Sequence, residues 1–238
     1  RNRLSIFLII GCLVIAGCGS SREAPVIRSA RDDAEEIAIG QRIHAEVLAQ
    51  TYPYTEPNVN AYINGIGSDL LVFAERKFLP YSFTILYDER RYATSAPGGF
   101  VYITTGMINF LDNEAELAAV LAHEIARLQY RDPRLRGGKK VLDGLKVASS
   151  VAGLFFGGYG AAASIGLQGL DLLLYSEATN MKQTLIGDER ALVYMVRAGY
   201  DPQGYVDVFK RIYAGDPENQ QMFYHYLISH PLDQKRLE

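Results

Sequence analysis

The sequence predicts an α+β fold in which helices flank a small sheet. Apolar residues recur at helical spacing through much of the chain, and two short segments, 81–87 and 100–104, are rich in β-branched and aromatic residues. The chain has 238 residues, of which 48% are hydrophobic and 21% charged, and this is enough for one sizeable core. Helices beside a small sheet indicate the α+β class.

The N-terminal segment has the pattern of an export signal. Two arginines stand within the first three residues, and residues 4–16 form an apolar run that is too short to remain as a membrane span. The run ends in Ile15-Ala16-Gly17-Cys18, which resembles the lipobox of bacterial lipoproteins. The resemblance implies a signal peptide over 1–17, lipidation of Cys18 and a lipidated tether over 18–29. The alternative is an ordinary signal peptide with an incidental cysteine.

Cysteine usage agrees with a lipid anchor in the membrane. The chain has two cysteines, and Cys12 lies in the segment that would be removed, so Cys18 would have no disulfide partner. Gly19, and not Asp, follows Cys18; by resemblance to enterobacterial sorting, this implies the outer membrane of a bacterial envelope, facing the periplasm. The formal charge of -3 and the pI near 5.9 argue against nucleic acid as a partner.

Apolar spacing and end signals predict five helices. They span residues 30–50, 57–76, 113–129, 188–198 and 204–214. The strongest is 113–129, where Asn113 and Glu116 form a capping-box pattern. Residues 148–174 are nearly uncharged, which is compatible with a membrane hairpin, but the glycine-rich break at 157–160 favours two short buried helices.

The helix at 113–129 contains part of a zinc-binding pattern. In HExxH helices, two His residues four apart share one face and bind Zn²⁺, and the Glu beside the first acts as general base on the metal-bound water. His123 and Glu124 match the first two positions, whereas Arg127 occupies the position of the second His. A His-Glu pair in a helix is by itself weak evidence for such a site.

Several further motifs surround this helix. They are, in order, Ala96-Pro97-Gly98-Gly99-Phe100-Val101-Tyr102-Ile103, Thr105-Gly106-Met107 and residues 112–126, with further segments at 36–41, 79–84, 194–202 and 229–237. Together these motifs resemble the metallopeptidase family numbered 48, which belongs to the HExxH gluzincins. The resemblance implies a gluzincin metallopeptidase-like domain over 30–238. It leaves open whether a repeat domain follows Glu238.

The resemblance also implies which residues would serve the site. Glu124 and Asp188 match the family's catalytic positions, and His123 matches a metal ligand. His230 matches a histidine that can approach the metal from the C-terminal side. The third ligand of the family is a Glu four residues before the Asp, and this position holds Thr184.

Two ligand positions are therefore lost. Arg127 has no acceptor atom and remains protonated, and Thr184 offers only a neutral oxygen. Catalytic zinc normally has three protein ligands. We therefore expect that zinc, the cofactor implied by the resemblance, is not bound and that catalysis is impaired or absent.

Three functions remain open. The first is a lipoprotein that binds extended or unfolded envelope protein segments for quality control or scaffolding, with strand 100–104 as the sheet edge to which they add. The second is an active zinc endopeptidase that degrades misfolded envelope proteins, and the third is a structural lipoprotein whose groove is filled. In each case we expect the helix of His123 to pack beside that of Asp188. Arg127 either pairs with Asp188 or Glu124 in place of the metal or extends into solvent.

Overall fold

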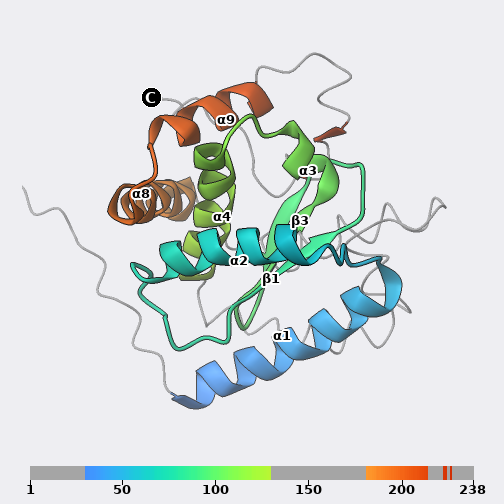
Figure 1. The fold of residues 1–238 in the computed structure, drawn as a ribbon. Coiled ribbons are helices and arrows are strands. Elements are labelled where there is room, and N and C mark those ends of the chain that lie inside the picture. Colours follow the sequence, from blue (N-terminus) through green and yellow to red (C-terminus); the bar gives the residue numbers. More distant parts are fainter. Residues whose placement is uncertain (1–29, 130–180, 214–221, 224–225, 227–238) are drawn as a thin grey trace, which may run out of the picture.

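The computed structural model describes residues 30–129, 181–213, 222, 223 and 226. Cys18, His230 and the segment 148–174 lie outside this part of the chain. In order, the elements are α1 (Ala30–Gln50), α2 (Pro57–Leu71), β1 (Ser82–Leu86), β2 (Ala93–Ala96), β3 (Phe100–Thr104), α3 (Thr105–Phe110), α4 (Glu114–Gln129), α8 (Met181–Ala198) and α9 (Gln203–Tyr213) (Figure 1). This arrangement of helices around a small sheet confirms the predicted α+β class.

The sheet has the strand order β1-β3-β2 and is mixed. Strand β3 runs parallel to β1, with Ser82 opposite Phe100, and antiparallel to β2, with Ala96 opposite Phe100. Strand β3 is therefore the central strand, and the prediction that 100–104 forms the exposed edge is wrong. Among the described strands, β1 and β2 are the edges, because the unpredicted strand β2 folds back onto β3 through a tight turn. Gly98 and Gly99 make that turn with φ of 81° and 100°, which an L side chain rarely adopts.

Helix α4 forms the centre of the core. An uninterrupted run from Glu116 to Ala126 is buried, and the helix packs against α2, α8, α9 and β2. Its N-terminus is capped as predicted by Asn113, whose Oδ1 accepts from the backbone N–H of Glu116 at 3.0 Å. The carboxylate of Glu116 accepts from the backbone N–H of Asp112 at 2.8 Å and pairs with Arg211 of α9, so it anchors a second helix as well.

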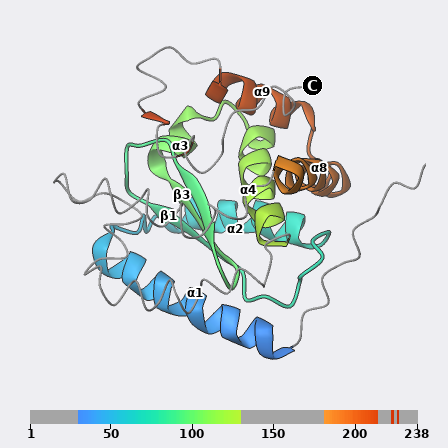
Figure 2. The ribbon, with the colours of Figure 1, turned by 180° about the vertical axis from the view of Figure 1, so that it is seen from behind.

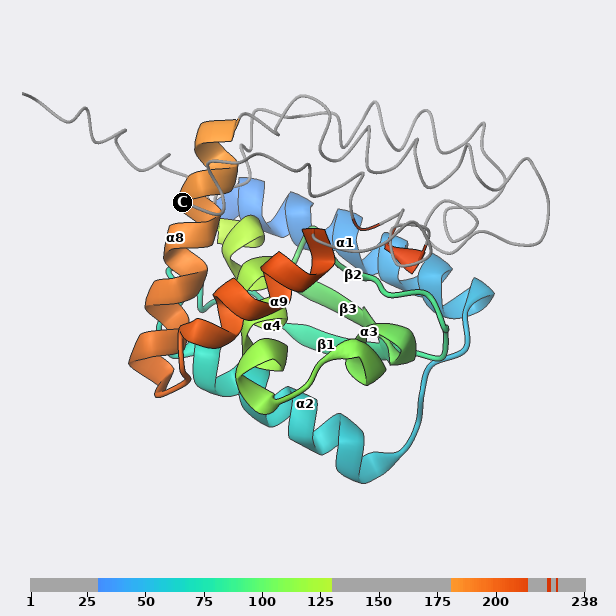
Figure 3. The same cartoon turned by 90° about the horizontal axis from the view of Figure 1, so that it is seen from above.

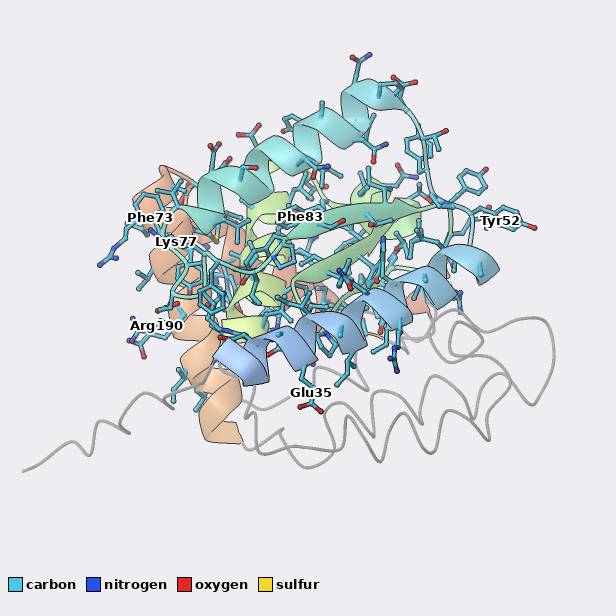
Figure 4. All side chains as sticks on the ribbon, turned by 90° about the horizontal axis from the view of Figure 1, so that it is seen from below. Glu35, Tyr52, Phe73, Lys77, Phe83 and Arg190 are labelled. Carbon is cyan, nitrogen blue, oxygen red and sulfur yellow. The ribbon has the colours of Figure 1, made fainter. Side chains whose placement is uncertain are left out.

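The sheet lies between α1 and α2, with α1 on the β2 side and α2 on the β1 side (Figures 3 and 4). Helix α1 approaches the β2–β3 turn so closely that a Cβ on Gly40 would lie 1.8 Å from the carbonyl oxygen of Pro97. The buried guanidinium of Arg76 fixes α1 further, since its Nη2 donates to Asp33 and to Glu36, each at 2.8 Å. Helix α1 therefore sets the position of the β2–β3 turn.

The predicted elements differ from the observed ones mainly at their ends. Helix α2 ends at Leu71, five residues before the predicted end, and α8 begins seven residues before the predicted Asp188. Strand β3 has the predicted bounds, and β1 is one residue shorter at each end than 81–87. Among the described helices, none is long and apolar enough to cross a membrane.

Candidate functional site

Helices α4 and α8 lie side by side and bring His123 and Asp188 together (Figures 1 and 2). Nδ1 of His123 lies 3.1 Å from Oδ1 of Asp188 and 2.9 Å from the hydroxyl oxygen of Tyr205, the second residue after the start of α9. All three side chains are buried. The expected packing of the His123 helix beside the Asp188 helix is thus observed.

The hydrogen bonds define the tautomer of His123. The Tyr205 hydroxyl donates its one hydrogen to Oδ1 of Asp188 at 2.7 Å, so its oxygen accepts from Nδ1–H of His123. Nδ1 therefore carries a proton, and in the neutral ring Nε2 is the acceptor. A carboxylate that holds one imidazole nitrogen in this way is the usual support of a metal-binding histidine, because it fixes both ring orientation and tautomer.

Glu124 is fully buried and is held from two directions. Its Oε2 accepts from Oγ of Ser95 in β2 at 2.9 Å, and its Oε1 lies 3.7 Å from Nη1 of Arg127, one turn further along α4. The Arg127 side chain is 13% exposed, whereas that of Glu124 is 0% exposed. An ionised carboxylate in such a place needs a nearby cation or several donors, since burial penalises the charged form.

Arg127 thus follows the predicted pairing with Glu124, one of the two partners that the sequence indicated. Asp188, the other, accepts a hydrogen bond from Tyr205 and lies 3.1 Å from Nδ1 of His123. Thr184 lies in α8, one helical turn before Asp188, as its spacing predicted. His230 lies outside the described residues.

Two residues of this cluster were missed by sequence reasoning. Ser95 belongs to a strand of small residues with no alternating pattern, and Tyr205 opens a helix far from α4 in sequence. Only the position of Ser95 just before the Pro97-Gly98-Gly99 turn could have pointed to it.

Comparison with known proteins agrees with this geometry. The family model described as Peptidase family M48 matches residues 55–238, which is well over half of the chain. The chain belongs to this peptidase family. The family is generally zinc-dependent, and the predicted resemblance is confirmed.

Several curated relatives of the chain are named as proteases. The beta-barrel assembly-enhancing protease of Yersinia pestis is 25% identical over 214 residues, covering 85% of this chain and 42% of the relative. The protein of that name from Escherichia coli K12 is 24% identical over 220 residues, with the same coverage. A protease HtpX homolog from Acidiphilium cryptum is 38% identical over 82 residues, covering 33% of this chain and 28% of the relative. The chain spans less than half the length of these relatives.

The described residues do not fit the zinc of this peptidase family. Within them, no three His, Cys, Asp or Glu side chains are grouped so that they could hold a metal ion. His123 occupies the first ligand position of the motif, but the second position holds a guanidinium, which carries five donors and no acceptor. That guanidinium is paired with Glu124, the family's general base. The described site therefore retains the family's scaffold, and the cation beside the carboxylate of Glu124 is a side chain, the guanidinium of Arg127.

Proposed function

We propose that this chain is an envelope lipoprotein whose peptidase domain binds extended protein segments and is catalytically disabled. The observation that carries the proposal is the ion pair between Arg127 and the fully buried Glu124. In a gluzincin, zinc lowers the pKa of its bound water, and the neighbouring Glu takes the proton. In this chain Glu124 faces the guanidinium of Arg127, which cannot act as a Lewis acid on a water molecule. The carboxylate of Glu124 therefore neutralises Arg127.

We place the binding of an extended segment at strand β2, whose four residues are buried, so the segment would have to displace the groups that cover this edge. This strand is an edge of the described sheet and lies against α4. Its residue Ser95 donates a hydrogen bond to Glu124 of that helix. The backbone N–H of Thr104 donates to the carbonyl of Tyr92, so alternate residues from Tyr92 onward face β3. The backbone groups of Ala93 and Ser95 consequently face the outer edge. A segment that adds there would pass directly beside Glu124, and its main-chain hydrogen bonds would give affinity with little sequence preference.

The location in the envelope is part of the proposal. The basic start, the apolar run and the small residues before Cys18 support a lipid anchor, and Gly19 supports the outer membrane on its periplasmic side. Cys18→Ala should leave the precursor uncleaved or release it from membranes, which fractionation and labelling with a palmitate analogue would measure. A mutant that fractionates like the wild type and takes up the label would contradict the anchor.

An active zinc endopeptidase is the second candidate, and one observation favours it. Asp188 and Tyr205 contact Nδ1 of His123, which is the kind of support that a metal-binding histidine usually has. The relatives are also named as proteases. This candidate requires ligands from outside the described residues, because Arg127 supplies none.

One pair of assays separates the two candidates. The disabled domain should bind an unfolded, labelled polypeptide reversibly and leave it intact, whether or not zinc is added. A matched peptide that is N-methylated at alternate residues should bind much more weakly, because it cannot complete a β-ladder with β2. Zinc-dependent cleavage that stops on chelation would support the endopeptidase, and equal binding of the methylated peptide would contradict the role of the strand edge.

A further inference from the structure

Three tyrosines, Tyr52, Tyr54 and Tyr87, form an aromatic surface that we call the tyrosine platform. Tyr52 is 79% exposed and Tyr87 is 67% exposed, and Figure 4 shows Tyr52 extending away from the loop between α1 and α2. The rings of Tyr54 and Tyr87 are nearly parallel, with an interplanar angle of 8° and centroids 6.5 Å apart. Clustered exposed aromatic side chains are typical of binding surfaces, since Tyr offers a rigid apolar face and a polar tip.

The backbone beneath the platform is held in place by hydrogen bonds. The N–H of Tyr54 donates to the carbonyl of Ile85 at 2.9 Å, and the N–H of Tyr87 donates to the carbonyl of Tyr52 at 2.8 Å. Pro53 and Leu86 form an antiparallel bridge between these bonds. The rings are therefore presented by an extension of β1, so a ligand would not have to order the loop when it binds.

Two cavities meet at the platform. One, of about 690 Å³, is lined by Tyr52, Pro53, Tyr54, Thr55, Glu56 and Tyr87. The other, of about 630 Å³, shares Tyr54 and Tyr87 and continues along α3 to Phe110, with Glu89 and Arg91 in its wall. The stacked pair Tyr54–Tyr87 is thus a ridge between two adjoining hollows.

The polar groups of this surface favour a ligand that accepts hydrogen bonds and carries positive charge. Within the described part of the chain, no hydrogen bond engages the hydroxyls of the three tyrosines. Each cavity has an exposed carboxylate in its wall, Glu56 in one and Glu89 in the other. The guanidinium of Arg91 lies over the ring of Phe110 at 4.8 Å.

We propose that the tyrosine platform binds a proline-rich, basic segment of another protein in the polyproline II conformation. Such a segment has no internal hydrogen bonds, so its carbonyls can accept from phenol hydroxyls while its proline rings pack between parallel aromatic rings. A Lys or Arg in the segment would meet Glu56 or Glu89. The platform contains no residue of β2, α4 or α8, so this proposal stands independently of the peptide-binding role of β2.

Fluorescence anisotropy with a short labelled peptide, with prolines in each turn and an arginine at one end, tests the proposal. Saturable binding is expected, and Tyr87→Ala should weaken it about tenfold, as loss of a central aromatic contact does. Tyr52→Ala should also weaken binding, and because Tyr52 is 79% exposed its loss leaves the fold intact. Replacing the peptide's prolines by alanine, or its arginine by glutamate, should have the same effect.

Tyr62→Ala is the matched control, because Tyr62 is 47% exposed and lies on α2 outside both cavities. It should bind the peptide like the wild type. The proposal is overturned if the peptide does not bind saturably, or if Tyr62→Ala weakens binding as much as Tyr87→Ala. Binding of a chitooligosaccharide at the platform in place of the peptide would likewise overturn it, since it would assign the rings to a glycan.

Discussion

Replacing Arg127 by alanine removes the guanidinium that pairs with the buried Glu124. At the observed 3.7 Å, two unit charges attract by about 4 kcal/mol at an effective dielectric constant of about 20. The partial exposure of Arg127 screens the pair, and Ser95 continues to donate to Glu124, so the net loss should be about 2–3 kcal/mol. For a domain of this size, that lowers Tm by about 5–10 °C, which calorimetry or a thermal melt would measure.

The double mutant Arg127→Ala/Glu124→Gln separates the charge from the packing. Without its carboxylate the site no longer needs a cation, so the double mutant should recover much of the loss. Arg197→Ala is the matched control, since Arg197 is exposed on α8, and it should change stability by less than about 0.5 kcal/mol. Strictly additive losses, or a single mutant as stable as this control, would refute the proposed replacement of the metal by Arg127.

Three further predictions test the scaffold and the lost ligands. Arg127→His with Thr184→Glu should bind zinc near stoichiometrically, as measured by metal analysis; no gain over Thr184→Glu alone would show that the ligand positions are misplaced. Gly40→Ala should destabilise the domain by more than about 2 kcal/mol in urea melts, because the added Cβ would overlap the backbone carbonyl of Pro97. In the control Gly65→Ala, the added Cβ would have no neighbouring atom within 4 Å, so this change should be neutral or stabilising by up to about 1 kcal/mol. Burial lowers the pKa of His44 from 6.5, so the folded domain binds a proton at this ring less readily than the unfolded chain does. The domain is therefore fully stable, as far as His44 is concerned, above about pH 6.5, and it loses stability as the pH falls. His44→Gln should make this dependence of stability on pH shallower, and an unchanged dependence would contradict the role of His44.

The helices and the two strands β1 and β3 were predictable because their signals are local. The capping pattern at Asn113 and Glu116 and the apolar run behind it place α4 almost to the residue. Helix α2 was predicted too long because Arg76 continues its local pattern, whereas the structure buries that guanidinium against the carboxylates of Asp33 and Glu36. Those partners lie some forty residues away, so a local pattern does not contain them.

Strand β2 shows the other limit. Ala93–Ala96 consists of small residues without the β-branched alternation that marks strands, and it is extended because it pairs with β3. Missing it made β3 look like an edge. In the site, His123, Glu124 and Arg127 could be predicted as one cluster because they share a helix. Ser95 and Tyr205 could not, since only the tertiary fold brings their elements to α4.

Metal analysis of the protein tests the central claim most directly, provided that the protein is purified without chelators and then equilibrated with a slight excess of zinc. The pairing of Arg127 with Glu124 predicts far less than one zinc per chain and no cleavage of an unfolded polypeptide. One tightly bound zinc per chain, with proteolysis that stops on its removal, would contradict the claim.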